Sequence, residues 1–255
     1  MRLLVSVSVN VTQRTYSSFM AGSAFFLRLF WSCRLTTKGV TMSILHSEPL
    51  ASLLDSLLKK SDAEPADGLS DGEVRRLKQS KTEYLYFYER LKDLPLAVSR
   101  ETGMLLYMLA RSSGAQTVVE YGTSFGISTL FLAAALRDNG SGHLITTEFE
   151  TSKVARARQN LTAGGLIDLV EIREGDALET LRTDLPKTVD FLLLDGAKAL
   201  YPEIFGLIES RLGPGALIVA DDAESSPDYL SLVRSSKRYM SVFITGDVEL
   251  SMFVG

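Results

Sequence analysis

From residue 117 onward, five apolar segments of the sequence each end in an acidic residue. These residues are Glu120, Glu148, Asp176, Asp195 and Asp221. We expect each segment to be a β-strand, and in an open α/β sheet ligands bind beyond the carboxyl ends of the parallel strands. A single acid at such a place is most often a helix N-cap or a solvated loop residue. Five in succession favour a shared site, at which carboxylates bind hydroxyl groups, cationic groups or a metal ion.

The segment VVEYGTSFGIST, residues 118–129, predicts a glycine-rich turn between a strand and a helix. Gly122 and Gly126 allow the backbone to approach a ligand closely at the helix N-terminus. A dinucleotide-binding fingerprint would have a further glycine where this chain has Ser124. Glu120, just before the turn, would repel a pyrophosphate but suits a cofactor that carries an ammonium and a sulfonium. The turn therefore favours S-adenosylmethionine over a nicotinamide dinucleotide.

Glu148 follows Gly126 by 22 positions and ends the next expected strand. From this place a carboxylate accepts hydrogen bonds from both hydroxyls of a ribose. The spacing fits an adenosyl cofactor and a nicotinamide cofactor equally well. An NAD(P)-dependent oxidoreductase therefore stays as an alternative, disfavoured by Ser124 and by the antiparallel end of the chain.

Strand and helix patterns alternate from residue 117 and predict a parallel sheet covered on both faces. The first five strands are expected at residues 117–122, 142–149, 170–177, 189–196 and 216–222, with helices at 127–139, 151–165, 178–185 and 201–215. The last two, 239–244 and 248–254, are joined only by TGD, which is too short for a parallel crossover. The fold class is thus a doubly wound, mostly parallel seven-stranded α/β sheet that ends in an antiparallel hairpin.

The residues before the sheet predict three further helices, at 48–60, 70–94 and 99–114, and the aromatic cluster in the second is expected to be packing. The domains are then a leader, 1–41; a helical segment, 42–95; and a cofactor-binding domain, 96–255. The leader has no acidic residue and fits a mitochondrial presequence or sequence upstream of a true start at Met42. Its apolar run is too short and too charged for a membrane span, so we expect a cytoplasmic protein, or a mitochondrial one if the presequence is genuine.

The composition excludes several classes of function. Residues 1–47 hold five basic residues and no acid, so the rest of the chain has 22 basic against 31 acidic residues, a net charge of about −9. This balance argues against nucleic acid as a partner. The single Cys33 excludes an intramolecular disulfide, and two histidines leave little for a zinc site or a Ser-His-Asp triad.

Five segments in this order, VVEYGTSFGIST, LITTEFE, REGDALETL, LLLDGAKALY and GALIVADDAE, resemble the catechol and caffeoyl-CoA type of O-methyltransferase over roughly residues 95–255. The resemblance implies a class I methyltransferase that binds S-adenosylmethionine. The implied cofactor site has its methionine end at the glycine turn, its ribose at a carboxylate and its adenine between an aromatic ring and an acidic loop. Its residues, in that order, are Glu120, Gly122, Thr123, Ser124, Gly126, Ser128, Glu148, Phe149, Asp176 and Ala177, with Asp195 beside the reacting group.

The same resemblance implies a divalent cation held by Asp195, Asp221 and Asp222. Hard oxygen ligands without histidine or cysteine suit Mg²⁺, or a similar ion such as Mn²⁺ or Ca²⁺. Asp222 stands where the family has asparagine, which makes the site more anionic or indicates that metal is not used. Lys198 matches the lysine that relatives place beside the accepting hydroxyl, where a lowered pKa would let it take a proton. The alternative is a surface lysine on the first turn of a helix.

We therefore expect methyl transfer from S-adenosylmethionine to a small-molecule hydroxyl, phenolic or catecholic, in a protein that forms a homodimer. Relatives have a Trp-Gly loop after the Asp-Asn pair, and its absence from AESSPDYLSL leaves the acceptor class open. The rival interpretation is a non-catalytic or metal-independent relative that binds the cofactor and acts through partners or its dimer surface.

Overall fold

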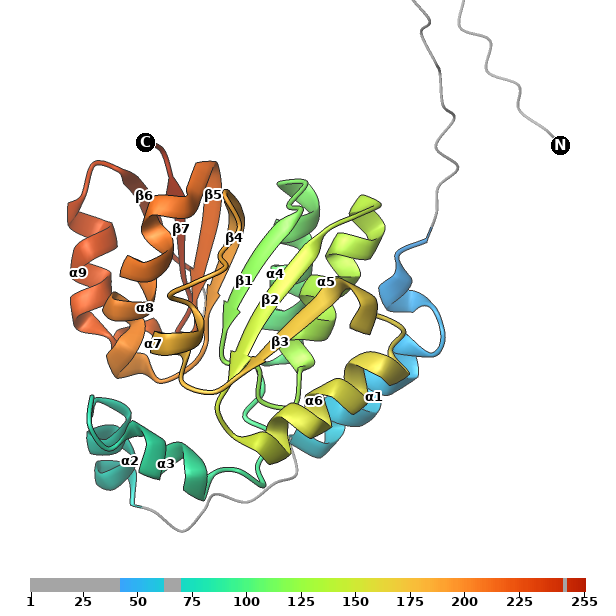
Figure 1. The fold of residues 1–255 in the computed structure, drawn as a ribbon, viewed down its shortest axis with the longest axis horizontal. Helices are drawn as coiled ribbons and strands as arrows, with labels where there is room; N and C mark the ends of the chain where they lie inside the picture. The colour runs from blue at the N-terminus through green and yellow to red at the C-terminus, as the bar shows by residue number, and fades with distance from the viewer. Residues whose placement is uncertain (1–41, 62–69, 245–246) are drawn as a thin grey trace, which may run out of the picture. The chain divides into compact units, whose positions relative to one another are not determined.

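The computed structural model describes residues 42–61, 70–244 and 247–255 (Figure 1). The expectations for residues 1–41, including the presequence and the alternative start, lie outside these described residues. In the part of the chain that is described, no helix is both long and apolar enough to cross a membrane.

The centre of the fold is a seven-stranded sheet in the order β3-β2-β1-β4-β5-β7-β6. Strands β1 to β5 pair in parallel, whereas β7 is antiparallel to both of its neighbours, β5 and β6. This confirms the predicted fold class and the terminal hairpin. The strands are β1 Thr117–Tyr121, β2 His143–Glu148, β3 Val170–Glu174, β4 Val189–Leu194, β5 Leu212–Ala220, β6 Tyr239–Phe243 and β7 Glu249–Phe253.

Helices cover both faces of the sheet, because successive strand residues point to opposite sides. Val118 and Leu144 belong to one buried cluster, whereas their neighbours Val119 and Ile145 belong to the other. The first face is covered by α1 Leu50–Ser61, α4 Arg100–Ser112, α5 Ile127–Asn139 and α6 Thr151–Ala163. The second is covered by α7 Ala177–Thr180, α8 Tyr201–Ile208 and α9 Pro227–Ser235 (Figure 1).

The helix predicted over residues 70–94 is wrong as a single element. The structure has two short helices, α2 Asp71–Lys78 and α3 Tyr84–Arg90, separated by a turn. In that turn the hydroxyl of Ser80 accepts a hydrogen bond from the backbone N–H of Glu83, at 3.0 Å. Serine oxygens compete with helical carbonyls in this way. The break places α2 and α3 next to the carboxyl ends of the strands (Figure 1).

The predictions around β5 also need correction. The helix expected to extend to residue 215 ends at Ile208, followed by a 3-10 turn, and β5 already begins at Leu212. Gly213 and Pro214 predict a helix stop, but here they lie inside an irregular stretch of pairing with β4. The sequence analysis also missed α9, which begins at Pro227, a favoured first-turn residue.

The ion pair between Arg234 and Glu249 gives a stability prediction. Glu249 on β7 is fully buried, and its two carboxylate oxygens accept hydrogen bonds from Arg234 at 2.8 and 2.7 Å. Arg234→Met leaves a buried carboxylate without its partner, so we expect the free energy of unfolding to fall by about 2–3 kcal/mol. Urea unfolding at pH 7 measures this. The matched Arg182→Met, which breaks an exposed pair with Glu179, should change it by less than about 0.5 kcal/mol; equal effects would contradict the argument.

Candidate active site

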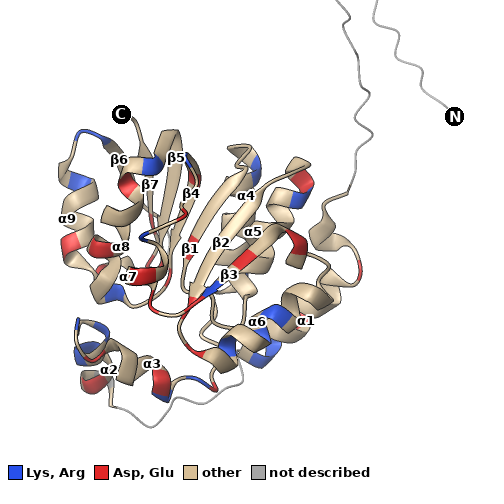
Figure 2. Ribbon diagram, in the orientation of Figure 1, with Lys and Arg blue, Asp and Glu red and all other residues tan. Residues whose placement is uncertain are grey.

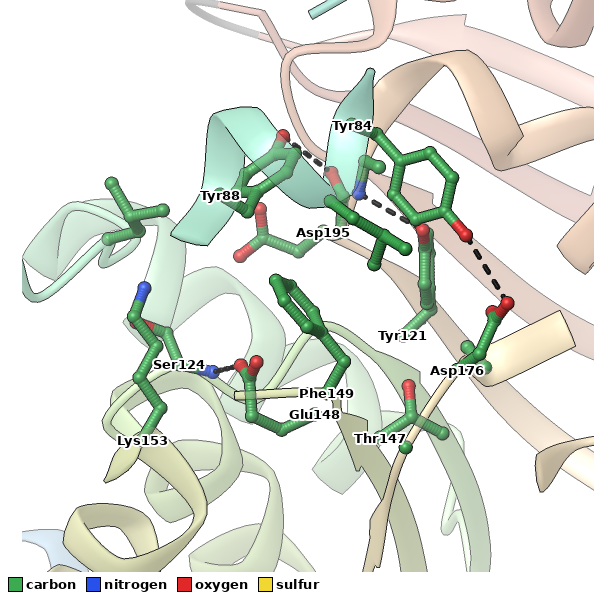
Figure 3. A pocket seen from close by; sticks show the side chains of 17 residues that line it. Tyr84, Tyr88, Tyr121, Ser124, Thr147, Glu148, Phe149, Lys153, Asp176 and Asp195 are labelled. Atoms are coloured by element: carbon green, nitrogen blue, oxygen red, sulfur yellow. Dashed lines mark hydrogen bonds between the residues drawn. The ribbon is translucent and has the colours of Figure 1, made fainter. Parts of the chain in front are cut away.

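A pocket opens at the carboxyl ends of β1 and β4, where the strand order reverses from β3-β2-β1 to β4-β5. Such a switch point is the usual ligand site of a doubly wound sheet. The pocket is a concave region in which apolar side chains surround a few polar groups, as is usual for small-molecule sites. Its lining comes from the strand ends, the glycine turn and helix α3 (Figure 3).

Gly122 lies where the turn crosses closest to β4. Its φ is +103°, and an added Cβ would lie 2.6 Å from the carbonyl oxygen of Asp195 and 2.8 Å from the backbone nitrogen of Gly196. Gly126, with φ of +82°, is the N-cap of α5. Glycine at both positions therefore allows a left-handed backbone, and at Gly122 it also allows the close approach of the two strand ends.

Two hydroxyl groups of the pocket lack hydrogen-bond partners within the described ranges. The side-chain oxygens of Ser124 and Thr147 are buried and unpaired, and Ser124 has a strained φ of +48°. Buried polar atoms are nearly always hydrogen-bonded in folded proteins. The arrangement thus fits a polar ligand that would satisfy these hydroxyls, and both residues line the pocket.

The carboxylate of Glu148 is held in place by the backbone. It accepts hydrogen bonds from the N–H of Ser124 at 2.9 Å and of Glu150 at 3.0 Å. Burial raises its pKa, against the effect of these backbone donors and of Lys153. Figure 3 shows Phe149 beside this carboxylate, with its ring directed into the pocket.

Asp176 and Ala177 form the opposite end of the pocket. One oxygen of Asp176 caps α7 by accepting from the N–H of Leu178 at 2.9 Å, and the other accepts from the hydroxyl of Tyr84 at 3.2 Å. Ala177 begins α7 and lines the pocket beside it. The end predicted for adenine is therefore closed by a tyrosine from α3 (Figure 3).

Glu120 lies behind the glycine turn and is fully buried, so it is not among the lining residues. Its oxygens accept hydrogen bonds from the hydroxyls of Ser128 at 2.6 Å and Thr129 at 2.5 Å. Burial raises its pKa to about 7, although these hydrogen bonds act in the other direction. Thr123, on the turn itself, is also buried and pairs with Thr146 and the carbonyl of Thr147.

Asp195, Asp221 and Lys198 meet on the other side of the turn. The ammonium of Lys198 lies 3.0 Å from an oxygen of Asp195 and 3.8 Å from an oxygen of Asp221. Burial raises the pKa of both carboxyl groups, and the neighbouring Asp195 helps to raise that of Asp221 to about 7. The sequence predicted that Asp195 and Asp221 follow adjacent strand ends, and β4 and β5 end directly before them.

The expected lowering of the Lys198 pKa is wrong. Burial alone would lower it, but Tyr201, Asp195 and Asp221 raise it well above its ordinary value. Lys198 is only 6% exposed, so it is not the surface lysine of the alternative interpretation either. It is a buried ammonium held between two carboxylates.

Asp222 pairs with a different lysine from the other two carboxylates. Its backbone is left-handed, with φ of +49°, and its oxygens accept hydrogen bonds from Lys78 at 2.7 Å and Ser225 at 2.8 Å. Burial would raise its pKa, but these two donors bring the value below the ordinary one. Among the described residues no group of three or more acidic, histidine or cysteine side chains is arranged to hold a metal ion, so the predicted metal site is not confirmed.

Comparisons with known proteins assign the chain to a family. A profile of the methyltransferase domain matches residues 119–223, which contain the glycine turn and the strand ends described above. A Mycolicibacterium vanbaalenii protein named as an O-methyltransferase is 31% identical over 163 residues, which cover 60% of this chain and 72% of that protein. The chain belongs to the class I S-adenosylmethionine-dependent O-methyltransferases.

Other relatives carry more specific names. The catechol O-methyltransferase of Niastella koreensis is 35% identical over 50% of this chain and 58% of its own length. That of Mycobacterium tuberculosis is 36% identical over 51% and 59%. The chain thus matches less than two thirds of the length of these two relatives.

Solved structures of O-methyltransferases share the fold. The Streptomyces achromogenes enzyme TomG, solved with S-adenosylmethionine, is 27% identical, with a TM-score of 0.57 over 73% of this chain and 92% of that one. A Bacillus cereus O-methyltransferase solved with S-adenosylhomocysteine has a TM-score of 0.61 over 80% and 91%, at 22% identity. The second similarity supports the fold alone.

The sequence patterns did not predict several residues that line the pocket. Tyr84 and Tyr88 of α3 line the pocket, and Tyr88 donates to the carbonyl of Gly196 at 3.3 Å. Their spacing of four residues puts both on one helix face, although the aromatic cluster is expected from the sequence to be packing. Lys153 is a buried lysine of the lining on the first turn of α6, and no pattern in the sequence distinguished it.

Proposed function

We propose that this protein transfers the methyl group of S-adenosylmethionine to a hydroxyl of a small molecule. The main observation behind the proposal is the pocket at the Gly122 turn. It contains the unpaired hydroxyls of Ser124 and Thr147 and the Glu148 carboxylate, which two backbone N–H groups hold in place. Membership of the O-methyltransferase family supports it. The names of the relatives favour a phenolic or catecholic acceptor.

The proposed cofactor would lie along the pocket from the glycine turn to α7. Glu148, fixed by two backbone donors, would accept the ribose hydroxyls. Phe149 would pack on the adenine. The edge of the adenine would contact Asp176 and Ala177 and would replace the hydroxyl of Tyr84 as the hydrogen-bond donor to Asp176. Gly122, Thr123, Ser124, Gly126 and Ser128 would surround the methionine end, with the charge of Glu120 behind them.

The reacting end of the pocket is next to Asp195. The acceptor oxygen would lie beside the Lys198 ammonium, which stabilises the negative charge that develops as the hydroxyl loses its proton. The proton would pass to a neighbouring carboxylate, Asp195 or Asp221. The oxygen would then attack the methyl group, and the bond to sulfur would break with its electron pair remaining on sulfur. Alignment of two bound reactants would supply much of the rate.

The family resemblance also implied assistance by Mg²⁺ or a similar cation at Asp195, Asp221 and Asp222. The observed arrangement does not fit this role, since Asp222 is engaged by Lys78 and Ser225. The proposed reaction therefore assigns no step to a metal ion.

Isothermal titration with S-adenosylmethionine and S-adenosylhomocysteine tests the base of the proposal. We expect both to bind at micromolar concentrations, and the absence of any binding would contradict it. A screen for methyl transfer to catechols and simple phenols tests the activity. Binding without transfer to any acceptor would favour the non-catalytic interpretation instead. Sedimentation of the same sample checks the predicted homodimer.

A further inference from the structure

Helix α2 reaches the acidic strand ends through Lys78. Its ammonium lies 2.7 Å from Asp222 although the two residues are 144 positions apart. Both side chains are partly shielded from solvent, with 34% and 21% of their surface exposed. Figure 2 shows that basic residues occur on and just after α2, the part of the chain that approaches these strand ends. The N-terminal helices therefore contribute a charge to the site.

Lys198 supplies a second positive charge at the same place. Its ammonium is 5.4 Å from the centre of the Tyr201 ring, in addition to its contacts with Asp195 and Asp221. The hydroxyl of Tyr201 donates to the carbonyls of Leu194 and Asp221, at 2.8 Å each, and so fixes the ring. The ammonium is thus held from three sides at the position between the two carboxylates.

These contacts leave little room for a divalent ion. A metal bound by Asp195 and Asp221 would lie beside the Lys198 ammonium, and like charges repel in a buried site. The resembling family combines a cation with such a lysine, so the exclusion of a metal depends on Asp222 as well. Asp222 has both oxygens engaged by Ser225 and Lys78. Its negative charge, at a position where the family resemblance implies a neutral asparagine, is the charge that Lys78 balances.

We propose that Lys78 and Lys198 supply the positive charge at Asp195, Asp221 and Asp222, and that this protein binds no divalent metal ion there. Three carboxylates face two ammonium groups, and the sulfonium of the proposed cofactor adds a third positive charge. Asp247, exposed on the turn before β7, adds a carboxylate at the rim that solvent screens. Lys78 is then a positioning residue: it holds Asp222 and α2 in place. The methyl-transfer part of this inference rests on the proposed function, whereas the metal-binding part does not.

Titration of the purified full chain with Mn²⁺, followed by the electron paramagnetic resonance signal of the free ion, tests the metal-binding part. We expect no stoichiometric binding up to about 1 mM, with or without S-adenosylhomocysteine. Stoichiometric binding below about 100 μM would overturn the proposal. Because this readout needs no turnover, it stays informative even if the proposed methyl transfer is wrong.

Substitutions at the ion pair sharpen the test. The variant Lys78→Gln removes one positive charge and frees an oxygen of Asp222, so that only Lys198 balances the three carboxylates and we expect Mn²⁺ affinity to rise at least tenfold. An unchanged affinity in the folded Lys78→Gln variant would count against the charge-balance argument. Lys81→Gln is the matched control, because Lys81 lies on the same segment and pairs with Glu203 at 2.6 Å, away from the three carboxylates. Circular dichroism confirms that each variant is folded.

If an acceptor is found, the rate after exhaustive EDTA treatment should stay within twofold of the untreated rate, and added Mg²⁺ should not increase it. A loss of more than tenfold that Mg²⁺ restores would overturn the proposal. Lys78→Arg keeps the charge and should retain most of the activity, whereas Lys78→Gln should lower kcat more than it changes the affinity for S-adenosylmethionine. Equal loss in both lysine variants would show that Lys78 is only structural.

Discussion

Gly122→Ala should abolish cofactor binding and lower the free energy of unfolding by about 3 kcal/mol. The new Cβ would lie 2.6–2.8 Å from backbone atoms of Asp195 and Gly196. Backbone cannot rotate away as a side chain can, so the turn and the end of β4 must separate. The φ of +103° adds strain for any residue with a Cβ. Isothermal titration measures the loss of binding, and urea unfolding measures the loss of stability.

Gly140→Ala separates the clash from the strain. Gly140 ends α5 with a φ of +96°, but an added Cβ would have no atom within 4 Å. It should therefore cost only about 1 kcal/mol and leave cofactor binding unchanged. If Gly122→Ala binds the cofactor like the wild type, or if both variants lose the same stability, the close approach at the turn is not what makes glycine necessary.

The fold followed from the sequence because local patterns and topology agree. The apolar strands, the paired glycines after α6 and the three-residue link before β7 each admit few arrangements. The prediction failed where tertiary contacts override a local pattern. Residues 70–94 look like one helix, yet Ser80 breaks it so that α2 can bring Lys78 to Asp222.

The candidate site, too, was predicted from the sequence only in part. The rule that strand ends meet at one edge was enough to bring Asp195 and Asp221 together. It could not show that Asp222 turns to Lys78, because the two residues lie on segments far apart in the sequence. It also could not give the pKa of Lys198, which depends on the balance between burial and four neighbouring groups. The periodicity of apolar residues does not predict which charged residues of distant segments lie close together.

Glu120→Gln should weaken binding of S-adenosylmethionine at pH 7.5 by at least 30-fold and reduce its dependence on pH between 6 and 7.5. In the wild type the pKa of Glu120 is raised to about 7 by burial. A cofactor that brings positive charge to the turn favours the ionised carboxylate, so wild-type affinity should rise as the pH increases through 7. The measurement stops at 7.5 because the amino group of the cofactor itself begins to lose its proton near 7.7–8.0.

The same substitution should stabilise the protein without cofactor. When the pKa of an acid is higher in the folded than in the unfolded state, the free energy of unfolding of the protein falls as the pH rises from about 4.5 to 7. This loss is complete above pH 7. Glutamine does not ionise, so at pH 8 the free energy of unfolding of the variant should be about 2 kcal/mol higher than that of the wild type. At pH 4.5 the two should differ little. A variant that is less stable at pH 8, yet binds the cofactor normally, would show that the hydrogen bonds from Ser128 and Thr129, rather than the charge, are the reason for an acid at this position.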